Sequence, residues 1–234
     1  MKPQFADKIG LTSILPFYAQ NGSLNEILGG LNFGSTQAMI MNPGSYSHQS
    51  LNQQLRQMTN AMRYLYEANA RKIICLGVLP LGCAPRIAWE SNQTSDGDII
   101  NGNGCVDNVN NWVLEYNRLL NEHIIKLNTE FSDAHIVFCD VYTGILEIIN
   151  KPRFYGFEDT KSACCGLGLN GAMIGCISTE LACNQASAHA WWDLLNPTEA
   201  VNSILAEAAW SNQPIPDLCR PFTIHELVHT KSNL

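Results

Sequence analysis

Two polar residues in the C-terminal third of the chain, Asp193 and Asn196, lie directly before an apolar helical pattern. The pattern covers residues 197–210, so we expect a helix to hold the preceding loop rigidly. A carboxylate in such a loop can orient a catalytic base, or it can cap the backbone of its own turn. Capping is the commoner role for an Asp before a helix, and spacing alone leaves both roles open.

The residues that follow predict where this helix begins. Pro197 suits the first helical turn, where its missing N–H group has no hydrogen bond to lose. Thr198 brings a side-chain acceptor and Glu199 a negative charge to the positive end of the helix.

Three histidines are further candidates for functional residues. His189 precedes Asp193 by four residues and could supply a base from a neighbouring strand, although a structural or surface role is the simpler interpretation. His225 and His229 have the i, i+4 spacing of two zinc ligands, but no third ligand accompanies them. A solvated C-terminal helix is therefore the favoured interpretation, and we predict neither a metal nor a cofactor.

Four blocks of sequence occur in the order seen in one known family. They begin with Gly-Gly-Leu-Asn-Phe-Gly-Ser at 29–35 and end with Asp-Leu-Leu-Asn-Pro-Thr at 193–198; the other two lie at 70–85 and 155–168. Over nearly its whole length the chain resembles the plant GDSL esterase/lipases, a branch of the SGNH hydrolases. The resemblance implies a three-layer, flavodoxin-like α/β fold with a parallel sheet, and hydrolysis of small-molecule or lipid carboxylic esters.

The resemblance also implies a Ser nucleophile, a His base, an Asp that orients it, and Gly and Asn donors to the oxyanion. Asp193 matches the family Asp, but Asn196 stands at the position of the His, and a carboxamide does not titrate near neutral pH. Thr36 and Gln37 replace a pair of Gly residues, and no Gly-x-Asn-Asp block occurs in the 234 residues. No intact oxyanion hole is therefore expected.

Two strands of the family fold have no counterpart in this sequence. The first strand, with its Gly-Asp-Ser-Leu block, should precede residue 1. The strand before Gly-x-Asn-Asp should interrupt residues 46–69, which instead form one helical pattern. We expect residues 1–234 to form a single partial SGNH domain, truncated and internally deleted, that is catalytically impaired or inactive. A lipid- or glycan-binding or regulatory pseudoenzyme and a fragment completed by another chain are the alternatives.

The remaining elements follow from hydrophobic periodicity. Residues 86–108 are a polar loop, 151–190 a Cys- and Gly-rich excursion, and the tail from residue 211 is expected to lack regular structure. The other segments are predicted as helices at 46–69, 106–127 and 143–150 and as buried strands at 72–79 and 135–141.

The nine cysteines divide into two groups. Cys75 and Cys139 lie in apolar strand-like runs and predict buried free thiols. The others fall in loop-like sequence and favour disulfides, hence an oxidising compartment: Cys83, Cys105, Cys164, Cys165, Cys176, Cys183 and Cys219. A Cys83–Cys105 bridge would add roughly 3 kcal/mol through loop entropy. A zinc site at the four cysteines of residues 164–183 is the alternative, but their spacing lacks Cys-x-x-Cys pairs.

The sequence predicts the cellular location of the protein less directly. The resemblance implies secretion, and the sequons at Asn21 and Asn92 are candidate glycosylation sites. Residues 1–8 lack the hydrophobic core of a signal peptide, a conflict that disappears if the true N-terminus lies further upstream. The net charge of −7 without a basic cluster argues against nucleic acid as a partner. No apolar run reaches the ~20 residues of a membrane span.

Overall fold

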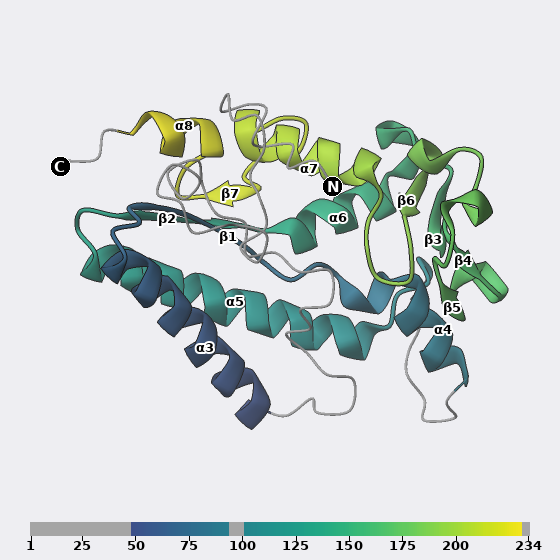
Figure 1. Cartoon of the computed structure of the whole chain (residues 1–234), viewed down its shortest axis with the longest axis horizontal. Coiled ribbons are helices and arrows are strands. Elements are labelled where there is room, and N and C mark those ends of the chain that lie inside the picture. Colours follow the sequence, from purple (N-terminus) through teal and green to yellow (C-terminus); the bar gives the residue numbers. More distant parts are fainter. Residues whose placement is uncertain (1–47, 94–100, 231–234) are drawn as a thin grey trace. The chain divides into compact units, whose positions relative to one another are not determined.

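Two parallel strands, β1 (Lys72–Leu76) and β2 (His135–Cys139), form the centre of the fold in the computed structural model (Figure 1). A short strand, β7 (Cys219–Arg220), pairs antiparallel with β2, so the sheet has the order β1-β2-β7. The structure describes residues 48–93 and 101–230, all of which belong to the unit Ser47–Leu234. The described part therefore has the expected α/β class, although its small sheet is mixed rather than wholly parallel.

Helices cover this sheet in two layers (Figure 1). On one face lie α3 (His48–Glu67) and α5 (Asp107–Glu130), which pack against each other. On the other face lie α6 (Val141–Asn150), α7 (Glu199–Ser211) and α8 (Ile224–His229). Because β1 and β2 are parallel, the chain must cross from the end of one strand to the start of the next, and α5 forms most of that crossover.

The long helices form where the apolar period predicted them. In α3 the buried residues Leu51, Leu55 and Met62 recur on one side, which confirms the predicted helix for the described residues. Along α5 the buried positions follow the same period, and the helix continues to Glu130, beyond the predicted end. It stops where the backbone N–H of Phe131 donates to Leu127, closing the last turn.

Strand β1 is shorter and more exposed than predicted. Its side chains alternate, with Ile73 and Cys75 buried, whereas Ile74 is 40% and Leu76 50% exposed. The strand ends before Val78 because the Asn117 side chain takes over the pairing there. Its amide oxygen accepts from Val78 N, and its amide nitrogen donates to Val78 O, both at 2.8 Å. The expectation of a fully buried strand over 72–79 is therefore wrong.

A helix occupies part of the predicted polar loop at 86–108. This helix, α4 (Pro85–Gln93), begins with Pro85, a residue suited to the first helical position. Arg86 and Glu90 form an i, i+4 ion pair along it, at 2.6 Å. Residues 94–100 lie outside the described residues, and the chain resumes in a turn that ends at Gly104, whose φ is +83°.

The excursion at 151–190 contains short strands and turns that the hydrophobic periodicity of the sequence did not predict. Its strands form two small separate pairs, β3 with β6 in parallel and β4 with β5 antiparallel. Short 3-10 turns connect them. The strands are β3 (Asp159–Ala163), β4 (Gly166–Leu167), β5 (Ile174–Gly175) and β6 (His189–Trp191); the turns are η3 (Pro152–Tyr155), η4 (Leu169–Gly171), η5 (Thr179–Leu181) and η6 (Ala186–Ala188), with η2 (Leu81–Cys83) before α4.

The C-terminal segment contains the helix predicted around His225 and His229, but it also contains a strand, contrary to the predicted irregular tail. Strand β7 joins the sheet, and α8 follows it with a capping box between Thr223 and Glu226. Glu226 accepts from Thr223 N at 2.8 Å, and Thr223 Oγ1 accepts from Glu226 N at 3.1 Å, so both residues satisfy first-turn donors. No helix within residues 48–93 and 101–230 is long and apolar enough to cross a membrane.

Candidate functional site

The loop that carries Asp193 is closed by its own carboxylate. Asp193 Oδ1 accepts from the backbone N–H of Leu195 at 3.0 Å and from that of Asn196 at 2.8 Å. The Asn196 carbonyl in turn accepts from Trp192 N at 2.8 Å. Asp193 therefore performs the local capping role that an Asp before a helix commonly has.

The side chains of Asp193 and Asn196 also meet directly. Asn196 Nδ2 lies 2.9 Å from Oδ1 and 2.9 Å from Oδ2 of the carboxylate. Because an ionised carboxylate only accepts hydrogen bonds, the amide nitrogen is the donor. The amide thus reproduces the N–H group with which an imidazole would bind this Asp. It offers no nitrogen that titrates near neutral pH, so the pair can hold its orientation but cannot take up a proton there.

Helix α7 and strand β6 hold this loop from both ends. Thr198, only 2% exposed, is the N-cap of α7 and accepts from Val201 N at 3.4 Å. Its hydroxyl donates to the His189 carbonyl at 2.7 Å, and its N–H donates to Ala190 O at 2.9 Å. The helix begins at Glu199, so Pro197 precedes the helix instead of occupying its first turn, contrary to expectation.

The side chain of His189 faces Asp159 instead of Asp193. Its Nε2 lies 3.9 Å from Asp159 Oδ2, and its Nδ1 lies 3.1 Å from the Gln185 carbonyl. Within the described residues, none of the hydrogen bonds or ion pairs of His189 reaches Asp193. The structure therefore does not bring this candidate base to the Asp193 loop.

The environment of Asp159 fixes its charge. Burial acts to raise the pKa of this carboxyl, but hydrogen bonds from Ser162 N at 2.8 Å and Lys161 N at 2.7 Å outweigh it. The pKa is therefore held below its usual range, and Asp159 is an anion beside His189 at neutral pH.

The C-terminal histidines pack against each other and against Trp210. The rings of His225 and His229 lie 4.3 Å apart, and the ring of Trp210 meets that of His225 edge-on at 5.1 Å. His229 Nδ1 is 2.7 Å from the His225 carbonyl, as the helical spacing allows. Across residues 48–93 and 101–230, no group of three or more His, Cys, Asp or Glu side chains is arranged to hold a metal ion.

Eight of the nine cysteines form disulfides, which confirms the expected oxidised chain. The assignment of Cys139 as a free thiol is wrong, because β7 carries its partner beside β2. The cysteines proposed as a zinc site form two bridges instead. Cys75 is free, and burial raises its pKa to about 12. The pairs are Cys83–Cys105, Cys139–Cys219, Cys164–Cys183 and Cys165–Cys176.

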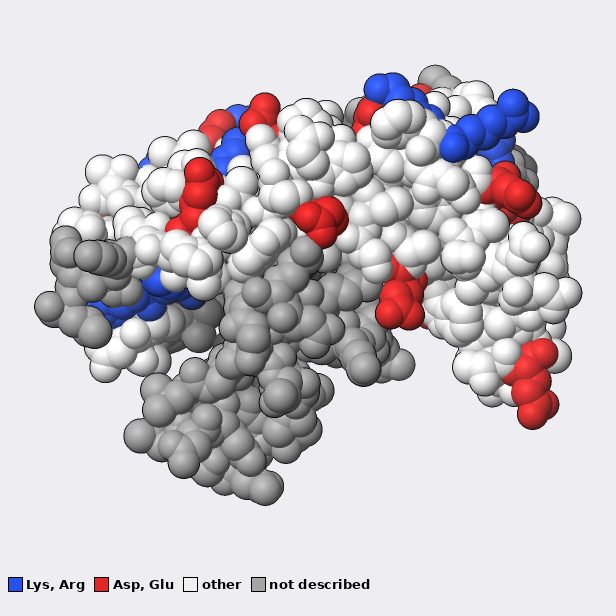
Figure 2. Space-filling view, turned by 90° about the horizontal axis from the view of Figure 1, so that it is seen from above, with Lys and Arg blue, Asp and Glu red and all other residues white. Residues whose placement is uncertain are grey.

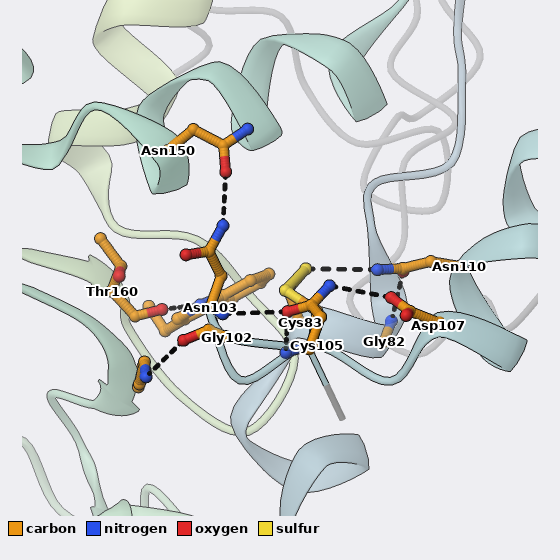
Figure 3. The surroundings of a disulfide bond; sticks show 12 residues. Gly82, Cys83, Gly102, Asn103, Cys105, Asp107, Asn110, Asn150 and Thr160 are labelled. Carbon is orange, nitrogen blue, oxygen red and sulfur yellow. Dashed lines mark hydrogen bonds between the residues drawn. A yellow bond between two sulfur atoms is a disulfide. The ribbon is translucent and has the colours of Figure 1, made fainter. Parts of the chain in front are cut away.

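The surroundings of the Cys83–Cys105 bridge are polar and closely packed (Figure 3). Asn110, on α5, accepts from Gly82 N through Oδ1 at 2.8 Å and donates to Cys83 Sγ through Nδ2 at 3.3 Å. The turn before Cys105 is tied to α6 by Asn103, which donates to Asn150 Oδ1 at 2.6 Å. The bridge and these hydrogen bonds together connect this part of the chain to α5 and to α6.

Three residues singled out from the sequence, Asn21, Thr36 and Gln37, lie outside the described residues. Asn92 is exposed near the end of α4, and its side-chain amide donates to Ala88 O at 3.0 Å.

Comparison with known proteins gives the family. The model of the GDSL-like lipase/acylhydrolase family matches residues 21–209. GDSL esterase/lipase At1g71250 of Arabidopsis thaliana is 32% identical over 215 residues, covering 92% of this chain and 54% of that protein. GDSL esterase/lipase At5g37690 from the same plant is 28% identical over 202 residues, covering 83% and 54%. GDSL esterase/lipase 7, also from Arabidopsis thaliana, is 31% identical over 163 residues, covering 70% and 43%.

The match extends over most of this chain but not over most of its relatives. The chain spans about half the length of the curated relatives it matches. Within that span the predicted resemblance is confirmed, and the chain belongs to the plant branch of the GDSL-like lipase/acylhydrolase family.

Proposed function

We propose that this chain derives from a carboxylic-ester hydrolase and that its Asp193 site, as it stands, does not catalyse ester hydrolysis. The observation that carries the proposal is the contact between Asn196 and Asp193, which takes the place of the His–Asp pair of a hydrolytic triad. Without a base, a Ser hydroxyl is not activated for attack on an acyl carbon. Loss of the base alone costs a Ser hydrolase a factor on the order of a million.

The reaction class comes from the family. Small-molecule or lipid carboxylic esters are the proposed ligands of the ancestral site. Two sequence features support loss of the remaining machinery: no Gly-x-Asn-Asp block occurs in the 234 residues, and Thr36 and Gln37 stand where the family has Gly.

We also propose that the described sheet is part of a larger one and that residues 1–234 contribute to a single SGNH-type domain. Among the described residues β1 is an edge strand, and its Ile74 and Leu76 are 40% and 50% exposed. The edge position of β1 leaves room for a further strand beside it. Parallel strands of α/β proteins are usually covered on both faces, so the exposure of Ile74 and Leu76 supports a further covering element over that face. A second chain is one source of such a strand. Co-purification with a full-length relative tests this, and its failure at micromolar concentration argues against completion in trans.

A secreted location is the proposal that fits the disulfides. Bridges of this number persist in oxidising compartments and are rare in the cytosol. The exposed Asn92 is then a candidate for N-glycosylation, as is Asn21. Passage through a eukaryotic secretory pathway should give a chain whose mobility shifts on endoglycosidase treatment. Asn92→Gln should lose that shift in whole or in part.

Hydrolysis of p-nitrophenyl acetate or butyrate by the purified, oxidised chain is the direct test. We expect no turnover above the buffer rate, because the residue beside Asp193 cannot accept a proton. Turnover that disappears in Asp193→Ala or His189→Ala would refute the proposal. Asp217→Asn is the control, since Asp217 is an exposed Asp beyond the other end of α7 and Asn tolerates its φ of +56°.

A non-catalytic binding role is the second candidate. One feature favours it: residues 164–183, a segment with several exposed apolar side chains, lie beside the Asp193 loop.

A further inference from the structure

The segment 164–183 exposes more large apolar side chains than any other stretch of the described residues. Five of the eleven exposed large hydrophobic residues lie within it. Single exposed apolar residues are ordinary on protein surfaces, but a concentration of them marks an interaction site. The five are Leu169 (65% exposed), Met173 (44%), Ile174 (53%), Ile177 (70%) and Leu181 (47%).

Two disulfides hold this segment, the apolar excursion, in its exposed position. Cys164–Cys183 closes its base, and Cys165–Cys176 links its interior. The Cys183 N–H also donates to the Cys164 carbonyl, at 2.7 Å. A flexible loop could fold its apolar side chains inward, but two disulfides within 20 residues restrict the backbone of this segment too strongly for that. The exposure therefore belongs to the architecture of the excursion.

The charge of the apolar excursion indicates which kind of surface it binds. Residues 164–183 contain one ionisable acidic residue, Glu180, and no Lys or Arg. Binding to anionic lipid depends on clustered Lys and Arg, which this segment lacks. In Figure 2, on the face shown, the end of the molecule that carries β4 and β5 has an uncharged surface between Lys or Arg side chains on one side and Asp or Glu side chains at its tip. A neutral or zwitterionic lipid surface is the partner that matches an apolar, uncharged projection.

The apolar excursion is joined to the Asp193 loop. Cys165 N donates to the Trp192 carbonyl at 2.6 Å. Arg86 links the two segments, since its N–H donates to Leu194 O at 3.1 Å and its guanidinium donates to Met173 O at 2.8 Å. A lipid surface that contacted the excursion would therefore lie next to the site at which the family handles esters.

We propose that the apolar excursion 164–183 adsorbs to the surface of neutral or zwitterionic lipid by inserting its exposed side chains, with Leu169 and Ile177 as the principal contacts. Adsorption buries apolar surface that water otherwise covers, and it needs no catalytic step. The inference therefore goes beyond the proposed function and stands whether or not the chain hydrolyses esters.

Sedimentation with sucrose-loaded vesicles of ether-linked phosphatidylcholine tests the proposal, because these lipids contain no carboxylic ester that could be cleaved. The oxidised chain should pellet with the vesicles. Leu169→Ser and Ile177→Ser should each lower the partition constant by roughly fivefold to tenfold, the effect of removing one inserted aliphatic side chain. Leu114→Ser and Ile125→Ser are matched controls, because these α5 residues are 50% and 58% exposed but lie outside the excursion. They should leave partitioning unchanged.

Four results would overturn the proposal. The first is absence of the wild-type chain from the vesicle pellet at millimolar lipid, and the second is equal weakening by the excursion and control substitutions. The third is binding that appears only after anionic lipid is added. Sedimentation velocity without lipid checks for self-association through the same side chains, and loss of a dimer in Ile177→Ser without any vesicle binding would also count against it. Circular dichroism confirms that each variant is folded, and the ester assay is read separately.

Discussion

Asn196 donates from one amide nitrogen to both carboxylate oxygens of Asp193, at 2.9 Å each. In the function proposed above, Asn196 stands at the position of the triad base, where it keeps the contact with the Asp and lacks a titratable nitrogen. A hydrogen bond to a charged group stabilises more than one between neutral groups, so this pair is expected to help hold the loop before α7.

Substitution of Asn196 should show how much this contact stabilises the folded chain. Asn196→Leu removes the donor and leaves the carboxylate without its side-chain partner, which should lower the free energy of unfolding by about 1–3 kcal/mol. Asn196→His restores a ring N–H facing Asp193 and should cost less. Urea denaturation of the three proteins measures the difference, and equal midpoints for the Leu variant and the wild type would contradict it.

The Cys139–Cys219 bridge should stabilise the chain more than the Cys165–Cys176 bridge. The two bridges span 80 and 11 residues, so the loop-entropy model gives about 4.5 and about 3 kcal/mol as their contributions. The longer bridge also fixes β7 to β2. Paired Cys→Ala variants, compared by thermal and urea denaturation, should show the larger loss for Cys139 and Cys219. The reverse order would refute the entropic argument.

Cys75 should be inert in the folded protein. Burial raises its pKa to about 12, so very little reactive thiolate exists at pH 8, and Cys75 as a whole residue is only 7% exposed. Titration with Ellman's reagent should detect no thiol in the native chain and one thiol per chain in guanidinium chloride. More than one thiol in the unfolded, non-reduced chain would show that a bridge is missing.

Gly82 should tolerate no side chain, whereas Gly102 should. A Cβ atom at Gly82 would lie 2.3 Å from the Val106 carbonyl oxygen and 2.8 Å from Asn110 Oδ1, both held beside the Cys83–Cys105 bridge. Gly82→Ala is expected to destabilise by about 1–3 kcal/mol or more, because backbone must move. At Gly102 nothing lies within 4 Å, so Gly102→Ala should change stability by less than about 1 kcal/mol. Urea midpoints of the two variants test the contrast.

Asp133 should make the free energy of unfolding depend on pH in the acidic range. Tyr66 Oη donates to its carboxylate at 2.7 Å and Arg71 Nε at 2.6 Å, and these bonds lower its pKa below the ordinary 3.8. A lowered folded-state pKa adds stability that is complete above the unfolded value and is lost as pH falls through the folded value. The urea midpoints of wild type and Asp133→Asn should therefore differ at pH 6, and the difference should begin to shrink only as the pH falls below about 4. A difference that persists unchanged at pH 3 would exclude this contribution.

The sequence by itself determined the elements whose pattern is local. The apolar period of α3 and α5 and the β-branched run of β2 fix a helix or a strand within one segment, and the observed elements agree to within a few residues. The Asp193 loop was found in the same way, since its polar residues directly precede the apolar face of α7. The oxidised state followed from cysteines in loop-like sequence.

Only the tertiary structure decided the features that join distant segments. Cys139 looked like a buried thiol because its partner lies 80 residues away, on a two-residue strand too short to leave a pattern. The exposure of Ile74 depends on what covers β1, and the direction of His189 depends on where Asp159 pairs across β3 and β6. The exposure of the apolar side chains at 164–183 was not predicted either, because a segment rich in Gly and Cys has no hydrophobic period. In each case the deciding contact links segments whose proximity the local sequence does not encode.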